Sequence, residues 1–161
     1  MVSIDVLKKY PFFIEMSDDQ LQELAAIATE ESHGAGEMIY STGDPANKLY
    51  MVVSGKIVMV MDTPMGPHRP PMRVNVDFLT GGESMGWSSL VEPHIYTLGA
   101  LCFEKSEVIA FDAETLRRII TDDCALGLKV MQSTAKIIAT RLNHFRMLLV
   151  GERRLSALTE F

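Results

Sequence analysis

The sequence predicts a mainly β, α+β fold in which a small antiparallel β jelly-roll barrel is flanked by an N-terminal helix and a long C-terminal helix. Two patterns predict it. Between residues 34 and 111, short β-branched and aromatic stretches alternate with glycine-containing turns, whereas both flanking segments repeat apolar residues at helical spacing. The chain has 161 residues, the length of one domain, so we expect residues 1–161 to form a single folding unit.

The first helix is predicted over residues 18–29. Ser17 and Gln20 have the three-residue spacing of a capping box, which satisfies free backbone N–H groups at a helix start. Apolar residues then recur at helical spacing, namely Leu21, Leu24, Ala25 and Ala28.

The barrel is predicted over residues 34–111. Its strands are expected at residues 37–40, 49–53, 56–61, 72–78, 98–103 and 108–111. Residues 63–71 hold four prolines, which cannot donate to a strand ladder, so this stretch is predicted to be the loop of a long, stiff hairpin. Ser54-Gly55 is expected to join the second and third strands through a tight turn.

Two C-terminal helices are predicted over residues 113–150. Asp112 is placed to cap a short helix, and Asp122 or Asp123 a longer one. We expect Gly151 to end or bend the long helix, leaving residues 152–161 as a short appendage.

The long helix carries an apolar seam with alternating spacings of four and three, made of Met131, Ala135, Ile138, Leu142, Phe145 and Leu149. This seam predicts a two-chain coiled coil, with Met131, Ile138, Leu142, Phe145 and Leu149 in a homodimer interface. The alternative is that one face of the helix packs on its own barrel. A second apolar line, Val130, Ile137 and Leu148, is available for that role.

Composition and charge exclude several classes of function. The net charge of −6 argues against a general nucleic-acid surface, and no apolar run approaches the length of a membrane span. No signal-peptide pattern begins the chain, so a cytoplasmic protein is expected.

Cysteine and histidine usage predicts neither a metal site nor an active site. Cys102 and Cys124 are too few for a four-cysteine site and are expected to be plain thiols. The four histidines are widely separated, and no local Ser/His/Asp or Cys/His arrangement suggests catalysis. We therefore expect a protein that is not an enzyme and holds no metal.

Three short motifs stand at the turns of the predicted barrel: Gly36-Glu37-x-Ile39, Gly43-Asp44-x-Ala46 and Leu49-Tyr50-x-Val52-x-Ser54-Gly55. In this order, between the two helical segments, they resemble the cyclic nucleotide-binding domain family, as found in bacterial catabolite-activator-type regulators and kinase regulatory subunits. The resemblance covers nearly the whole chain and implies a jelly roll that binds a small effector.

The family's ligand site is a phosphate-binding cassette, which residues 81–97 of this chain resemble. The segment opens with Gly81-Gly82-Glu83, and a glycine-rich turn into a short helix favours an anion. By the resemblance, Glu83 would accept hydrogen bonds from a ribose hydroxyl. The ligand contacts are expected at Gly82, Glu83, Ser84, Gly86, Trp87, Ser88, Tyr96 and Thr97.

The family pattern also places an arginine on the next strand, where it would pair with the cyclic phosphate. Here the corresponding segment reads Tyr96-Thr97-Leu98, so the arginine is missing, although Thr97 keeps a hydroxyl there. A charge-assisted arginine–phosphate contact contributes roughly 1.5–3 kcal/mol, so the site is expected to bind cAMP weakly or to serve another small molecule. Arg73 or Arg69 of the proline-rich hairpin is the alternative source of a cation.

These observations predict a regulatory small-molecule sensor, with a cyclic nucleotide or another small-molecule effector as the expected ligand and no certain cofactor. The first alternative is the sensor half of a larger DNA-binding transcription regulator, and the second is a ligand-free interaction or dimerisation protein. The expected partners are the effector, a second copy of the chain and a downstream protein. This chain itself is expected to contact neither nucleic acid nor a membrane.

Overall fold

Eight strands form two four-stranded antiparallel sheets in the computed structural model, which describes residues 2–159 and their side chains as far as Gly151. The strand order is β1-β8-β3-β6 in one sheet and β2-β7-β4-β5 in the other. The strands are β1 (Ala28–His33), β2 (Met38–Tyr40), β3 (Lys48–Ser54), β4 (Lys56–Thr63), β5 (Met72–Thr80), β6 (Ser84–Met85), β7 (Gly99–Cys102) and β8 (Ser106–Asp112). Consecutive strands mostly lie in opposite sheets, which confirms the jelly roll. The pairing among the described residues leaves two separate sheets rather than a closed barrel.

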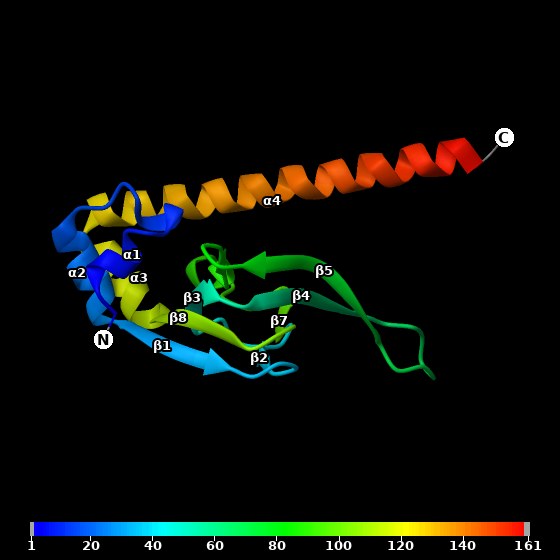
Figure 1. Ribbon diagram of the computed structural model, residues 1–161, viewed down its shortest axis with the longest axis horizontal. Coiled ribbons are helices and arrows are strands. Elements are labelled where there is room, and N and C mark those ends of the chain that lie inside the picture. The colour runs from blue at the N-terminus through cyan, green and yellow to red at the C-terminus, as the bar shows by residue number, and fades with distance from the viewer. Residues whose placement is uncertain (1, 160–161) are drawn as a thin grey trace.

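The helices are α1 (Ile4–Leu7), the 3-10 helix η1 (Pro11–Phe13), α2 (Asp18–Ala26), the 3-10 helix η2 (Trp87–Leu90), α3 (Ala113–Asp122) and α4 (Cys124–Thr159). Helices α1, α2 and α3 gather at one end of the sheets, where the long helix α4 begins (Figure 1). The predicted capping box is present at the start of α2, where the backbone N–H of Gln20 donates to Ser17 Oγ at 3.3 Å and that of Ser17 to Gln20 Oε1 at 3.2 Å. Asp112 caps α3 as predicted, since its carboxylate accepts from the backbone N–H of Thr115 at 2.8 Å.

Strand β3 is buried on both faces because its successive side chains point to opposite sides. Leu49 and Met51 pack against the helical layer, in a core that includes Phe13, Leu24 and Leu116. Tyr50 and Val52 point the other way, into a second core between the sheets. The helices therefore cover one face of a sheet whose opposite face packs on the second sheet.

The first helix is shorter than the predicted residues 18–29. Helix α2 ends at Ala26, and Ala28–His33 form β1, which pairs antiparallel with β8 from Ala28↔Phe111 to His33↔Ser106. The strand is polar and mostly exposed after Ala28, so it lacks the alternation of apolar residues that marks a strand. Backbone pairing with β8 decides its conformation, and local sequence does not.

The proline-rich stretch is a hairpin loop, as predicted. Strand β4 ends at Thr63 and β5 begins at Met72, and the two are paired from Lys56↔Thr80 to Thr63↔Met72. Figure 1 shows this hairpin extending well past the other strands.

The prediction that Gly151 ends or bends the long helix is wrong, because α4 continues through Gly151 to Thr159. An interior glycine disfavours a helix by only about 1 kcal/mol relative to alanine, which the flanking helical residues tolerate. The helix runs past the sheets along their length (Figure 1). None of the helices in the described part of the chain is both long and apolar enough to cross a membrane.

The start of α4 packs on the chain's own core, and its later turns do not. Val130 is fully buried and Ile137 packs against the helical core, whereas Leu148, the third residue of that apolar line, is half exposed. On the predicted seam, Ile138 and Phe145 are half-buried. Met131, Leu142 and Leu149 are 41%, 48% and 60% exposed, so part of the seam has no cover within the chain.

The position of α4 against α3 depends on Gly127, and we expect Gly127→Ala to destabilise the protein. A Cβ at this position would press into the backbone carbonyl of Ile120 in α3. Overpacking of this kind lowers the free energy of unfolding by about 1–3 kcal/mol. Gly151→Ala is the matched control on the same helix, because nothing lies within 4 Å of the added atom there. Urea denaturation should show a loss for the first variant and no loss for the second, and equal behaviour would contradict the close approach.

Candidate ligand-binding site

A cavity of about 230 Å³ lies between β2, β4, β5, residues 86–98 and α4. Its aromatic wall residues are Tyr40, Trp87, Tyr96 and Phe145. Its aliphatic and thioether wall residues are Met59, Leu98, Ile138 and Leu142. Its polar groups come from Asp77, Ser88, Thr97 and Arg141, and Gly86 completes the lining. An apolar cavity with a few polar groups has the usual chemistry of a small-molecule site.

The turn at Gly86 sets the shape of the cassette. Strand β6 holds the segment before it on the core, since Met85 pairs with Tyr50 of β3. Gly86 has φ +79°, in the left-handed region, and a Cβ here would come within 2.8 Å of the Lys48 carbonyl oxygen and 3.3 Å of the Tyr96 ring. Only glycine fits without strain, so this residue directs the chain from β6 into η2 beside the cavity.

Tyr96 is the residue expected from the sequence to stand where the family pattern has an arginine. Its ring stacks on Tyr40 with 3.7 Å between ring centroids and 15° between planes. Its hydroxyl donates to the Lys48 carbonyl at 2.7 Å and accepts from the Lys48 N–H at 3.1 Å. Burial raises the pKa of Tyr40 and of Tyr96 above that of a free tyrosine, so both phenols remain neutral. This wall therefore offers aromatic surface and no positive charge.

The structure divides the predicted ligand contacts between two cavities. The cavity described above, called the main cavity from here on, is lined by five of them: Gly86, Trp87, Ser88, Tyr96 and Thr97. Gly82, Glu83 and Ser84 instead line a second cavity of about 250 Å³, bordered by η1 and α4.

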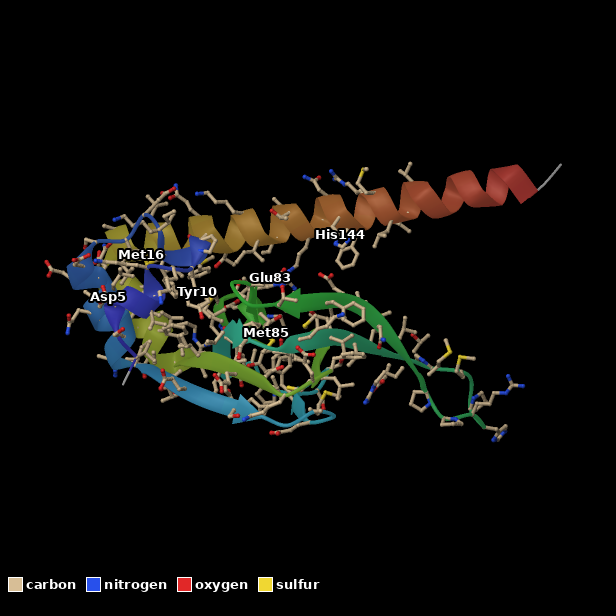
Figure 2. All side chains as sticks on the ribbon, in the orientation of Figure 1. Asp5, Tyr10, Met16, Glu83, Met85 and His144 are labelled. Atoms are coloured by element: carbon tan, nitrogen blue, oxygen red, sulfur yellow. The ribbon has the colours of Figure 1, made fainter. Side chains whose placement is uncertain are left out.

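Glu83 closes the turn at the start of the cassette. Its carboxylate accepts from the backbone N–H of Thr80 at 2.8 Å and from the Thr80 hydroxyl at 3.3 Å. Figure 2 places Glu83 on the side of the sheet that faces α4. Its carboxylate is thereby engaged in the β5–β6 turn rather than presented to the main cavity.

Arg141 of α4 is a site residue that the sequence reasoning missed. It is half-buried, lines both cavities, and donates from Nη2 to the Ser84 carbonyl at 2.6 Å. The two arginines proposed from the sequence lie on the hairpin, where Arg73 forms an ion pair with Asp62 at 2.8 Å. Its spacing in the sequence could have indicated it. Arg141 stands three residues after Ile138, so the two side chains share one face of the helix, which is the face that borders the cavity.

Asp77 of β5 brings a carboxylate to the same cavity. Its side chain is 13% exposed, and His144 of α4 lies 3.9 Å away, measured from Nδ1 to Asp77 Oδ1. Figure 2 shows His144 on the part of α4 that passes over β5. Positive and negative groups thus reach the cavity from different elements, Arg141 from the helix and Asp77 from the sheet.

Two arginines tie the cassette to the C-terminal helices. Arg117 of α3 donates from Nη1 to the Ser89 carbonyl in η2 at 2.6 Å, and Arg141 of α4 reaches Ser84 at the other end of the segment. Through these two hydrogen bonds, η2 is in direct contact with α3, and β6 with α4.

No cluster of three or more His, Cys, Asp or Glu side chains with metal-binding geometry occurs among residues 2–151. Cys102 is buried and Cys124 is exposed, both as free thiols. Burial raises the pKa of the Cys102 thiol, which keeps it protonated and a poor nucleophile.

Comparison with curated proteins finds partial matches to larger proteins. A Glutaminase 1 from Bradyrhizobium diazoefficiens is 29% identical over 138 residues, which cover 84% of this chain and 21% of that protein. A CRP-like cAMP-activated global transcriptional regulator from Mycobacterium tuberculosis is 25% identical over 108 residues, 66% of this chain and 44% of that protein. The chain spans less than half the length of either relative.

Comparison with solved structures supports the same fold. A protein from Geobacter metallireducens, described as cyclic nucleotide-binding, is 27% identical with a TM-score of 0.77, covering 88% of this chain and 99% of that one. The catabolite activator protein of Thermus thermophilus has a TM-score of 0.68 at 23% identity, covering 86% of this chain and 61% of that one, which shows the shared fold.

The family comparison agrees with the motifs, the jelly roll and the cassette described above. The sequence profile of the cyclic nucleotide-binding domain matches residues 30–123, from β1 to the junction of α3 and α4 and thus over half of the chain. The chain therefore belongs to the cyclic nucleotide-binding domain family.

Proposed function

We propose that this chain is a regulatory module that senses a small molecule in the main cavity and binds cAMP weakly. One observation carries the proposal: the cavity is bordered by both the cassette and α4, and the wall where the sequence leads us to expect an arginine carries the neutral, stacked ring of Tyr96. A phosphate placed against this wall would lack a charge-assisted contact of about 1.5–3 kcal/mol, which corresponds to one to two orders of magnitude in affinity. The proposed role is regulatory rather than catalytic.

The route from ligand to output runs through the two helices. Ile138, Leu142 and Phe145 of α4 line the cavity, so a ligand would contact the helix itself. The Arg117–Ser89 and Arg141–Ser84 contacts connect the cassette to α3 and α4. A ligand that favours one arrangement of these elements shifts the population towards it. A shift of the helices relative to the sheets is the expected output.

The downstream role has two versions, a free-standing sensor that acts on a separate protein, or the sensor part of a longer DNA-binding regulator. The match to 44% of the mycobacterial regulator supports the second version. Whether the reading frame continues beyond Phe161 distinguishes them.

A second copy of the chain is the proposed partner of α4. Met131, Leu142 and Leu149 of the seam are substantially exposed, and each large apolar side chain contributes roughly 1.5–3 kcal/mol when fully buried. A parallel pair of α4 helices about a two-fold axis would cover this seam in a closed, self-complementary way. Because Leu142 also lines the cavity, the dimer would lie next to the ligand site.

Adding a cation at position 96 should convert the pocket towards cAMP. We expect wild-type affinity for cAMP to be micromolar or weaker, and Tyr96→Arg to tighten it by about tenfold or more. Tyr96→Gln is the control, because it also removes the stacked ring but adds no charge. Isothermal titration calorimetry on folded samples checks this, and a nanomolar wild type or equal affinities of the two variants would contradict the proposal.

The dimer is tested outside the cavity lining. Met131→Glu combined with Leu149→Glu should turn a wild-type dimer into a folded monomer, because two carboxylates would enter the seam. Met147→Glu is the matched control, since Met147 is 74% exposed and lies on the opposite face of the helix. Light scattering gives the masses. A wild type that is monomeric at high micromolar concentration would show that the seam is not an interface.

A further inference from the structure

The main cavity contains two ionisable groups of opposite charge in an otherwise mostly apolar lining. Arg141 projects from α4 and Asp77 from β5, and no ion pair among the described side chains joins them or includes Arg141. The positive charge of the site is therefore on α4, and not on the opposite wall, where Tyr96 lies.

Arg141 has donors to spare. A guanidinium carries five N–H donors, and the hydrogen bond to the Ser84 carbonyl uses one of them. A planar guanidinium matches a carboxylate or phosphate in a two-point contact, and partial burial strengthens such a contact by excluding water. Arg141 is thus equipped to hold one anionic group inside the cavity.

Asp77 restricts the ligand to a single negative charge at this site. Its largely buried carboxylate would repel a second negative charge, but it can accept a hydrogen bond from an N–H or O–H of a ligand. The two residues together select a ligand with an anion at one end and a donor at the other.

Size and wall chemistry narrow the ligand further. The volume of about 230 Å³ is below the roughly 300–1,000 Å³ usual for ligand pockets. Four aromatic rings border this space, those of Tyr40, Trp87, Tyr96 and Phe145, and flat aromatic ligands pack well against such walls. A one- or two-ring aromatic compound suits this space better than a complete nucleotide.

We infer that the effector is a compact aromatic monoanion whose negative group is bound by Arg141 of α4. This inference rests on the proposed sensing function and names its ligand class. The family pattern implies that the anionic group of the ligand faces the wall that carries Tyr96. In the inferred complex this group would face α4 instead. Binding would then act on α4 directly, through a residue that also contacts the cassette at Ser84.

The experiment uses acid and amide pairs that differ only in the charged group. The probes are indole-3-acetate with indole-3-acetamide, 4-hydroxybenzoate with 4-hydroxybenzamide, and 4-hydroxyphenylacetate with 4-hydroxyphenylacetamide, titrated by calorimetry into wild-type protein. We expect at least one acid to bind about tenfold tighter than its amide, and that preference to fall to about onefold in Arg141→Gln. Arg141→Lys keeps the charge without the two-point geometry and should retain part of the preference.

Arg73→Gln is the control variant, because Arg73 is paired with Asp62 on the hairpin and does not line the cavity. Its acid preference should equal that of the wild type. Thermal unfolding of every variant confirms that it is folded, and Arg141→Lys provides the comparison if Arg141→Gln is not.

Three outcomes would overturn the inference. An acid preference that persists in Arg141→Gln would place the anion elsewhere, and cAMP or cGMP binding tighter than every acid would assign the cavity to nucleotides. Both leave the proposed sensing function standing. Absence of binding by all acids, amides and cyclic nucleotides would overturn the inference and the sensing function together, in favour of an interaction protein.

Discussion

Strand β3 is the element against which the rest of the structure is built, because its alternating side chains are buried on both sides. Leu49 and Met51 hold the helical layer, and Tyr50 and Val52 hold the opposite sheet. Each such side chain contributes roughly 1.5–3 kcal/mol when fully buried, so the strand joins two cores that would otherwise be independent. It also pairs with β8 on one side and β6 on the other, which attaches the cassette directly to a strand that belongs to both cores.

Because of this attachment, one wall of the candidate site belongs to the core and the opposite wall is α4. Tyr96 is stacked on Tyr40 and hydrogen-bonded to the backbone of Lys48 at the start of β3. The cavity wall formed by these two tyrosines is therefore part of the core. Beyond its buried first turns, α4 touches the sheets through few groups, among them the Arg141 contact to Ser84. A ligand in the cavity would therefore lie between the core and the helix.

The charged groups of the cavity lie away from its tyrosine wall. The wall formed by Tyr40 and Tyr96 is aromatic and neutral. Burial raises the pKa of both phenols, so no anion forms there. The cation sits on the helix and a carboxylate on β5. The proposed ligand contact at Arg141 and the proposed dimer seam therefore lie on the same helix, α4, and Leu142 belongs to both the cavity lining and the seam.

Much of the fold follows from residues that are neighbours in sequence. The capping box at Ser17 and Gln20, the cap at Asp112 and the proline-rich hairpin loop all form where spacing predicts them, because their partners lie within a few residues. The order of the elements and the family motifs also identify the jelly roll before any coordinates are known.

The remaining features depend on contacts between distant parts of the chain. The polar strand β1 is a strand only because β8 pairs with it, about eighty residues away, as the Thr29 hydroxyl bond to Ala110 across 81 positions illustrates. The placement of Arg141 follows from how α4 crosses the cassette, 57 positions from its partner Ser84. Sequence by itself determined the helix caps, the proline-rich loop and the family. Only the tertiary structure decided which side chains share a cavity, because that depends on the packing of whole elements and not on residue spacing.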